Sequence, residues 1–492
     1  MKKLFFALLL LPFALAASPT RVLTLDNQQM LVTDDSDATI YYHLAPNFKD
    51  HFYVDVLNSG KTLGWAFLDV KVGTLVLWWN KDYNNKTVYD QLVSGNKLGY
   101  TYADLNSSTG NAYAPLERWI KAPEVKLSVG YALELGDSAT LGLCFQYAGV
   151  NQTRDSASTD GEGNPLQTGS PLSLSRYLST GTAGFYNNLT VTSYKNTQSS
   201  TGMSFAPSLG INASNFSIDA KAEAFENSLN NSHSEDVANA AGDRMGTVTQ
   251  GLKDEGKLSW LAMGKFRMPF KSGNLIIRGG YRNFDFSTQH TQKGAFSGTG
   301  FATAQELAGF DHVDAEEILT QKIWDSMLGY TMDFNKSRGM LVLGLGLNGN
   351  STHQEDILYG PRTGGGPIDY NALATQTRNV ADSDLIAAPL LLGAEMEIAK
   401  FAKCSGVVSH NVYSSSTAKN VSETYSTGTG NPLQSRTTTQ GVTDQTPSWT
   451  LGTGLGLYFG SFTWDMAVNT GLLASSGNIV NPAYQSSLGW GF

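Results

Sequence analysis

Apolar and polar residues alternate strictly along residues 124–150. From Val125 to Leu135 the odd positions are apolar, whereas the even positions are small, polar or charged. Because successive side chains of a strand point to opposite faces, this period of two predicts a strand with one apolar and one polar face. A similar run follows the turn residues 136–138, so the two runs predict a β-hairpin.

Each predicted strand is about ten residues long, which is enough to cross a bilayer when the strand is tilted. The same alternation recurs at residues 324–347 and, most clearly, at residues 449–469. A soluble β-sandwich would need shorter strands and a polar outer face. The pattern therefore predicts an all-β fold, a transmembrane antiparallel β-barrel whose polar strand faces line a watery lumen.

Short and long connections alternate along the chain, as periplasmic turns and extracellular loops do in outer-membrane barrels. We predict short turns at residues 72–73, 136–138, 212–214, 269–273, 335–339, 402–406 and 459–461, and long polar loops at residues 81–123, 151–200, 227–254, 287–318, 351–382 and 415–446. With one strand before Thr62 and one after the last loop, these turns give about 16 strands. The alternative is about 14, if residues 51–57 lie outside the wall and one long loop is wrongly assigned.

Two segments precede the predicted barrel, which occupies residues 51–492. Residues 1–16 have two lysines, an apolar run and an Ala-Leu-Ala cleavage site, which predicts a signal peptide and Sec export. Residues 17–50 carry no strong pattern, and we expect an N-terminal segment that lies on the periplasmic side or plugs the barrel.

Composition and charge agree with an exported β-protein. Only 16% of the residues are charged, and the net charge of −9 argues against nucleic acid as a partner. Cys144 and Cys404 lie far apart in the sequence. The sequence leaves open whether they form a disulfide, although each is better explained as an unpaired cysteine that serves as a small side chain.

Charged residues on the polar strand faces are the candidates for lining a pore. They are Lys126, Glu134, Lys257, Lys265, Arg267, Arg278, Arg282, Glu395 and Asp465. Five of the six basic members lie between Lys257 and Arg282, so one expectation is a transverse field across an open lumen. The other is that these charges pair and stabilise a plugged wall, and the sequence does not decide between the two.

Motifs for catalysis or metal binding are weak. Residues 136–141 (GDSATL) resemble the start of a GDSL hydrolase motif, but they fall in a hairpin turn rather than between a strand and a helix. Acidic residues near His312 and His353 are better explained as solvated loop charge than as metal ligands. We expect no enzyme activity, no cofactor and no metal.

The chain ends in Tyr484, Leu488, Trp490 and Phe492 on one face of a final strand. In this it resembles the Gram-negative outer-membrane β-barrel proteins, whose last strand ends in an aromatic residue, usually Phe, as a signal to the barrel-assembly machinery. Its size and its N-terminal segment resemble those of general porins and FadL-type channels. The resemblance implies an outer-membrane location and contact with membrane lipid. The resemblance to porins also makes a homo-oligomer possible, although no residue pattern in the chain indicates one.

These observations favour an outer-membrane channel for passive diffusion or uptake of small solutes. Two alternatives remain open: a non-conducting barrel that displays its loops for adhesion, and a transporter of hydrophobic substrates.

Overall fold

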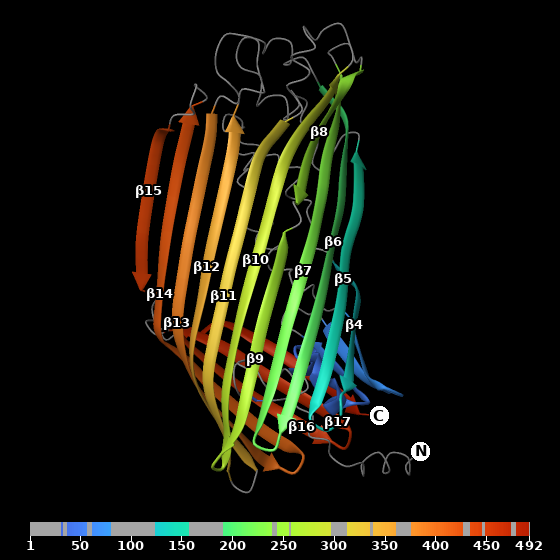
Figure 1. The fold of residues 1–492 in the computed structure, drawn as a ribbon, viewed down its shortest axis with the longest axis vertical. Coiled ribbons are helices and arrows are strands. Elements are labelled where there is room, and N and C mark those ends of the chain that lie inside the picture. The colour runs from blue at the N-terminus through green and yellow to red at the C-terminus, as the bar shows by residue number, and fades with distance from the viewer. Residues whose placement is uncertain are drawn as a thin grey trace.

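The computed structural model is an antiparallel β-barrel with a high wall on one side and a low wall on the other (Figure 1). It describes residues 31–32, 37–56, 62–79, 124–156, 190–238, 244–254, 257–296, 312–334, 338–360, 375–426, 433–444, 448–473 and 479–491. Among these residues, no helix is long and apolar enough to span a membrane.

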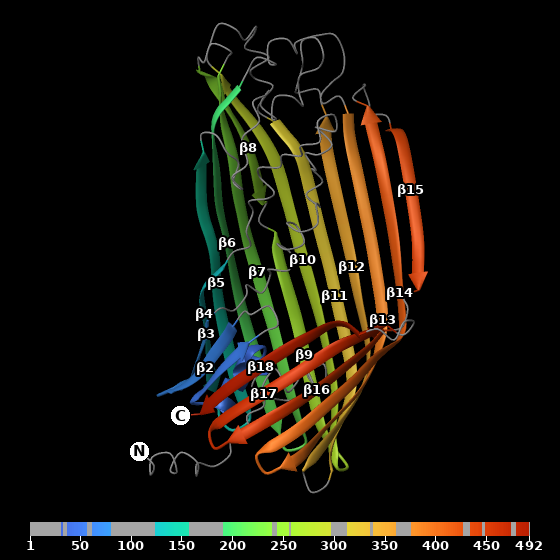
Figure 2. The same cartoon turned by 180° about the vertical axis from the view of Figure 1, so that it is seen from behind.

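The low wall consists of seven short strands, and Figure 2 shows β16, β17 and β18 of this wall crossing the bottom of the molecule. They are β1 (His51–Val56), β2 (Thr62–Val70), β3 (Gly73–Trp79), β4 (Glu124–Glu134), β16 (Ser448–Phe459), β17 (Phe462–Leu473) and β18 (Ile479–Gly491).

The high wall consists of eight long strands and of three shorter strands that share a position in the ring with another strand. The long strands are β5 (Ala139–Ser156), β6 (Thr190–Ala213), β7 (Phe216–Ala238), β10 (Gly273–Phe296), β11 (His312–Phe334), β12 (Gly339–Gly360), β13 (Thr375–Ala399) and β14 (Ala402–Ser426). The remaining strands are β8 (Arg244–Asp254), β9 (Leu258–Phe270) and β15 (Leu433–Asp444).

Neighbouring strands pair in sequence order, and the described strands fill sixteen positions in a closed ring. β8 and β9 lie one above the other between β7 and β10, and β15 and β16 do the same along β14. β1 closes the ring with β18, from His51 opposite Gly491 to Val56 opposite Ser486. The expected sixteen-stranded barrel, with residues 51–56 in its wall, is therefore confirmed.

The predicted alternation of faces is also confirmed. In the β4–β5 hairpin, Leu143 and Phe145 are exposed on the outer face, whereas Cys144 and Gln146 are buried on the inner face. Further exposed apolar residues continue this outer band around the wall, among them Leu328, Leu343, Leu345, Leu390 and Leu392. Aromatic pairs flank the band, with Phe401 on Phe459 near the turns and Trp260 on Tyr281 higher up.

The long strands continue well beyond the apolar band, into segments where we expected loops. Residues 227–254 are almost entirely strand, since β7 and β8 are separated only by residues 239–243. β12, β13 and β14 likewise extend into the predicted loops 351–382 and 415–446. The turn expected at residues 402–406 was wrong, because β13 ends at Ala399 and β14 begins at Ala402.

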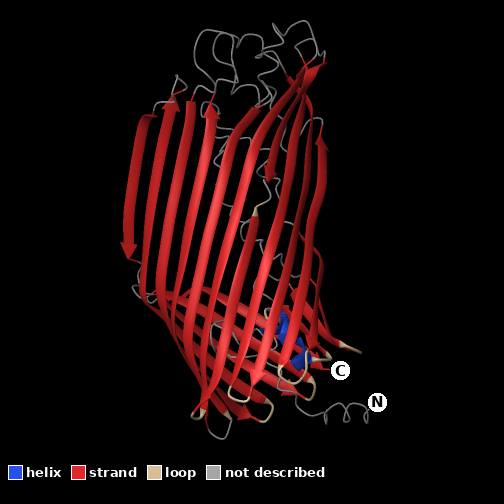
Figure 3. Cartoon of the chain, in the orientation of Figure 1, coloured by secondary structure: helices blue, strands red, loops and turns tan. Residues whose placement is uncertain are grey.

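Inside the lower barrel lie two short 3₁₀ helices of the N-terminal segment, drawn in blue in Figure 3. They are η1 (Asp37–Thr39) and η2 (Tyr42–Phe48), and η2 touches β2 to β6. The signal peptide predicted at residues 1–16 lies outside the described residues.

A charge in the apolar band tests the position of the membrane. Leu345 is 53% exposed on the outer face of β12, about halfway up the band, so Leu345→Arg is expected to destabilise the folded barrel by roughly 2–4 kcal/mol. Val442 on β15 is 66% exposed but lies above the band, and Val442→Arg is expected to cost less than about 1 kcal/mol. Urea titration of the refolded protein in lipid vesicles measures both values; equal costs would contradict this placement.

Candidate functional site

The candidate site is the lower lumen, where the N-terminal segment fits against glycines of the wall. A Cβ atom on Gly142 would lie 2.3 Å from the backbone nitrogen of His43, and one on Gly210 would lie 2.3 Å from the His43 ring. On another part of the wall, a Cβ on Gly329 would lie 2.4 Å from Leu31. The wall is therefore shaped to receive this segment, and we call residues 31–32 and 37–48 the plug.

Apolar contacts hold the plug at two places. Ala38, Tyr41, Leu44 and Ala45 are buried in a cluster with wall residues of β1 to β4, namely Tyr53, Trp65, Phe67, Val76 and Ala132. Leu31 and Val32 form a second cluster with Ile276, Met327, Val342, Leu391 and Val407 of β10 to β14. Because the two clusters lie on different parts of the ring, the plug crosses the lumen.

A buried ion pair links the plug to the high wall. Lys265 of β9 places its Nζ atom 2.6 Å from Oδ2 of Asp37 and 3.9 Å from Oδ2 of Asp219. The Lys265 side chain has no exposed surface, and its Nζ lies 5.6 Å from the centre of the Tyr41 ring. Burial raises the pKa of Tyr41, and the nearby carboxylates of Asp37 and Asp219 raise it further, so the phenol stays protonated.

His43 makes the second polar link. Its Nε2 lies 2.9 Å from Oδ1 of Asp219, and its backbone N–H donates to Oγ of Ser208 at 3.0 Å. One residue earlier, the Tyr42 hydroxyl lies 3.5 Å from Nζ of Lys221. Three consecutive tyrosine and histidine side chains thus lie against charged side chains of β7 and β9.

Several of the predicted pore-lining charges are paired. Lys265 binds the plug, Arg278 forms an ion pair with Asp325 at 2.5 Å, and Glu395 pairs with Lys403 at 3.4 Å. Asp465 is buried on the inner face and accepts a hydrogen bond of 3.4 Å from Tyr458. These contacts fit the expectation of a paired, plugged wall better than that of an open transverse field.

The other predicted pore residues lie nearer the barrel ends or higher in the wall. Lys126 is exposed beside Glu124, and Glu134 lies 3.7 Å from Lys49. Lys257 is partly buried just before β9. Arg267 and Arg282 are partly buried, and the period of two places them on the lumen side of β9 and β10.

The sequence did not assign a contact to the plug residues Asp37, Tyr42 and His43, because their segment has no periodic pattern. It also missed Asp219, Lys221 and Glu223 of β7, which share the inner face; Lys221 and Glu223 form an ion pair of 2.7 Å. Three charges at every second position of a strand are the signal that could have found them.

The final strand presents Tyr484, Leu488 and Trp490 on its outer face, where each is more than a third exposed. Phe492, the last residue of the predicted insertion signal, lies outside the described residues.

Both cysteines are free thiols. The described residues contain no group of three or more His, Cys, Asp or Glu side chains that could hold a metal ion. His353 instead pairs with Asp382 at 2.7 Å and with Glu355 at 3.7 Å.

No protein-family model and no curated protein matches the chain. Solved structures that match it include the translocator domain of the autotransporter NalP from Neisseria meningitidis, with 12% identity over 73% of this chain and 89% of that chain and a TM-score of 0.23. The P. putida toluene transporter TodX matches with 8% identity over 90% and 89% of the two chains and a TM-score of 0.25. The ferric-catecholate import receptor Fiu from E. coli K12 matches with 9% identity, 90% and 81% coverage and a TM-score of 0.27. Scores this low carry no argument about fold or function.

Removal of one partner of the buried ion pair is expected to loosen the plug. Lys265→Met leaves the carboxylate of Asp37 buried beside Asp219, which should destabilise the seated plug by roughly 3–5 kcal/mol. A cysteine at Ala38, which is fully buried, reports this change when Cys144 and Cys404 are replaced by serine. Its labelling by a maleimide should become at least about a hundredfold faster.

The matched control is the double variant Lys265→Met with Asp37→Leu, which removes both charges together. Replacement of a buried pair by apolar residues is often neutral, so labelling should return toward the wild-type rate. Equal labelling rates in the wild type and in Lys265→Met would show that this pair does not hold the plug.

Proposed function

We propose that the protein is a channel in the Gram-negative outer membrane, through which small solutes pass when the plug leaves the lower lumen. The observation that carries the proposal is the plug itself, a short segment that crosses a lumen lined with polar and charged side chains. Sec export, lipid contact along the apolar band and insertion by the barrel-assembly machinery belong to the same proposal. The long strands and their connections would face the outside of the cell.

The polar contacts support a plug that can be released. When the plug leaves, Asp219 remains next to Lys265 at 3.9 Å, and Lys221 remains paired with Glu223 at 2.7 Å. The plug residues Asp37, Tyr41, Tyr42 and His43 leave these contacts, and their polar groups become hydrated in solvent. Lys265 therefore loses its contact with Asp37, but each of the two buried lysines keeps a carboxylate of the wall nearby, which lowers the electrostatic cost of opening.

An alternative is uptake of a hydrophobic solute. Phe225 of β7 and Phe284 of β10 are both buried, with ring centres 6.3 Å apart, and Phe286 is also buried. This aromatic group lies above the plug on the same side of the barrel as Lys265, and it could hold an apolar molecule. The second alternative, a silent display barrel, draws support from the strands that extend beyond the apolar band.

Single-channel recording in a planar bilayer tests the channel and its plug. Gly142→Ala places a methyl group against the His43 backbone, whereas Gly264→Ala meets only the Asp219 carbonyl oxygen at 3.6 Å and serves as the control. We expect stepwise conductance after deletion of residues 17–50, and an open probability at least about tenfold above wild type in Gly142→Ala. Gly264→Ala should behave like the wild type.

Two results would reject parts of this proposal. A silent barrel after the deletion would exclude an ion-conducting channel and favour display or hydrophobic uptake. Identical conductance with and without residues 17–50 would show that the plug does not close the lumen.

Arg282 provides an independent test of the route. It lies on the lumen side of β10 opposite Leu261, so in the plug-deleted protein Arg282→Gln should shift the reversal potential toward cation preference. The exposed Lys126 near the end of β4 is the control, and Lys126→Gln should change the selectivity less. An unchanged reversal potential in Arg282→Gln would place the ion path elsewhere.

A further inference from the structure

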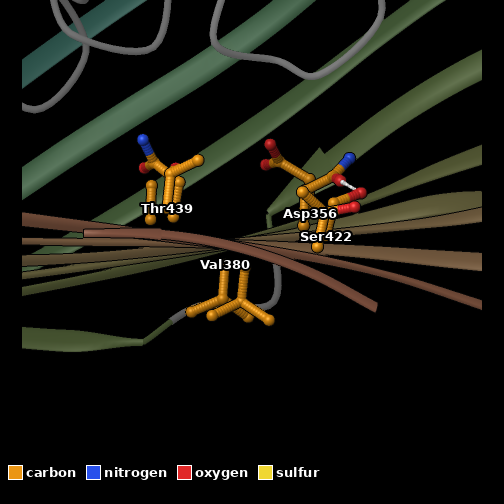
Figure 4. A pocket seen from close by; sticks show the side chains of 9 residues that line it. Asp356, Val380, Ser422 and Thr439 are labelled. Atoms are coloured by element: carbon orange, nitrogen blue, oxygen red, sulfur yellow. Dashed lines mark hydrogen bonds between the residues drawn. The ribbon is translucent and has the colours of Figure 1, made fainter. Parts of the chain in front are cut away.

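A shallow recess lies on the upper wall, where β12 to β15 continue beyond the apolar band (Figure 4). Its lining residues come from all four strands and are Asp356, Asn379, Val380, Ala381, Asn420, Val421, Ser422, Thr437 and Thr439. Most of them have polar, uncharged side chains. The recess is remote from the plug, so it is independent of the channel proposed above.

The strand register gathers the polar side chains on one face. Asp356 lies opposite Asn379, Asn379 opposite Ser422, and Ser422 opposite Thr437. Directly opposed residues of paired strands point to the same side, so these four form a row across the sheet. Asn420 opposite Thr439 forms the adjacent row on the same face. Val380 lies opposite Val421 on the other side, and Figure 4 shows Val380 pointing away from Asp356, Ser422 and Thr439.

The two rows form a regular array of hydrogen-bonding groups. Neighbouring strands are about 4.8 Å apart, and residues on one face of a strand follow each other at about 6.7 Å. The Ser422 hydroxyl donates to Oδ1 of Asn379 at 2.8 Å, which fixes the orientation of that amide. The amides of Asn379 and Asn420 and the hydroxyls of Thr437 and Thr439 each offer both donor and acceptor capacity.

The chemistry of the lining excludes several ligand classes. It has no basic side chain that could bind an anion. Its single carboxylate, Asp356, is too few for a divalent cation, which needs several oxygen ligands and usually more than one carboxylate. It has no aromatic or arginine side chain of the kind that anchors a protein partner. A ligand that suits this face is neutral and presents many hydroxyl groups.

We propose that this face of β12 to β15 binds a neutral oligosaccharide chain. Sugar hydroxyls both donate and accept hydrogen bonds, as do the amides and hydroxyls of the two rows. Burial raises the pKa of Asp356 to about 6, so near that pH its carboxyl group can either accept a hydrogen bond from a sugar hydroxyl or donate one. Because no aromatic ring lines the recess and it is open to solvent, we expect a Kd of about 1 mM.

The proposal is tested on the full-length protein in detergent micelles by saturation-transfer NMR titration. Maltohexaose serves as the neutral probe, a hexamer of hyaluronate as the anionic one, and an uncharged Ser/Thr/Asn-rich hexapeptide as the peptide probe. The test variant is Thr437→Val with Thr439→Val, which keeps side-chain size and β-propensity but removes two hydroxyls from the recess.

The matched control is Thr417→Val with Thr438→Val. Thr438 of β15 lies opposite Val421, and Thr417 of β14 lies opposite Val442, so both face the side of the sheet that is opposite to the recess. We expect wild type and control to bind maltohexaose alike, and the test variant to bind it at least about tenfold more weakly. Binding of hyaluronate should be weaker than that of maltohexaose in all three proteins.

Three results would overturn the proposal. One is the absence of maltohexaose binding by the wild type at 30 times the expected Kd, about 30 mM. Another is an equal loss in the test and control variants, which would place the sugar elsewhere. The third is tighter binding of hyaluronate or of the peptide than of maltohexaose, which would show that the face selects another chemistry.

Discussion

Pairing of backbone groups in the apolar band is the constraint on which this fold depends. An unpaired N–H or C=O group in hydrocarbon costs several kcal/mol, so a sheet that crosses a membrane must close on itself. The six residue pairs between β1 and β18 provide that closure. They also explain why β1, only six residues long, belongs to the wall. Above the band this constraint is absent, and the strands there reach different heights.

The freedom of the upper wall is clearest at β15. It pairs with β14 from Ser415 to Tyr425, and no described strand pairs with its other edge. All of its described side chains are exposed, so both of its faces meet solvent. Such an edge would be unstable inside the band, whereas water can satisfy its backbone groups above it. The change in environment along one strand therefore divides the barrel into a lower ring that encloses and an upper wall that presents surfaces.

The sequence predicted the lower ring well, for a physical reason. Within the band, lipid on one side and lumen on the other force an alternation of apolar and polar residues, as at Leu143 and Cys144, and this alternation is visible in the sequence. Above the band both faces are polar, so the alternation disappears although the strand continues. For this reason the sequence pattern predicts loops at residues 227–254 and in much of β12 to β15, where the structure has strands. The strand count was unaffected, because it depends on the turns at the other end.

A plug was one of two expectations for residues 17–50, but its contacts could not be predicted because they are not periodic. Asp37 and His43 find their partners Lys265 and Asp219 on strands about two hundred residues away, and a single sequence contains no sign of that pairing. The sequence of β7 contains a partial sign of the binding surface, because Asp219, Lys221 and Glu223 place three charges on the inner face of one strand. A buried ion pair is weak evidence for stability, since desolvation offsets the attraction between its charges. The ion pair is better evidence for the position of the plug. The carboxylate of Asp37 can be buried only next to a cation, so Lys265 determines where the plug binds.

The plug and the recess on the upper wall depend on different parts of the barrel. The plug contacts β1 to β7 and β9 to β14 in the lower ring, whereas the recess belongs to the upper ends of β12 to β15. Along β12, Gly344 touches Leu31 of the plug, and Asp356 lies twelve residues farther on, about 40 Å along the strand. Substitutions separated by such a distance, with no shared partner, usually act additively. Closure of the lumen and recognition at the upper wall are therefore separable properties of one sheet. The inner face of the sheet determines closure within the membrane, and the inner face above the membrane determines recognition.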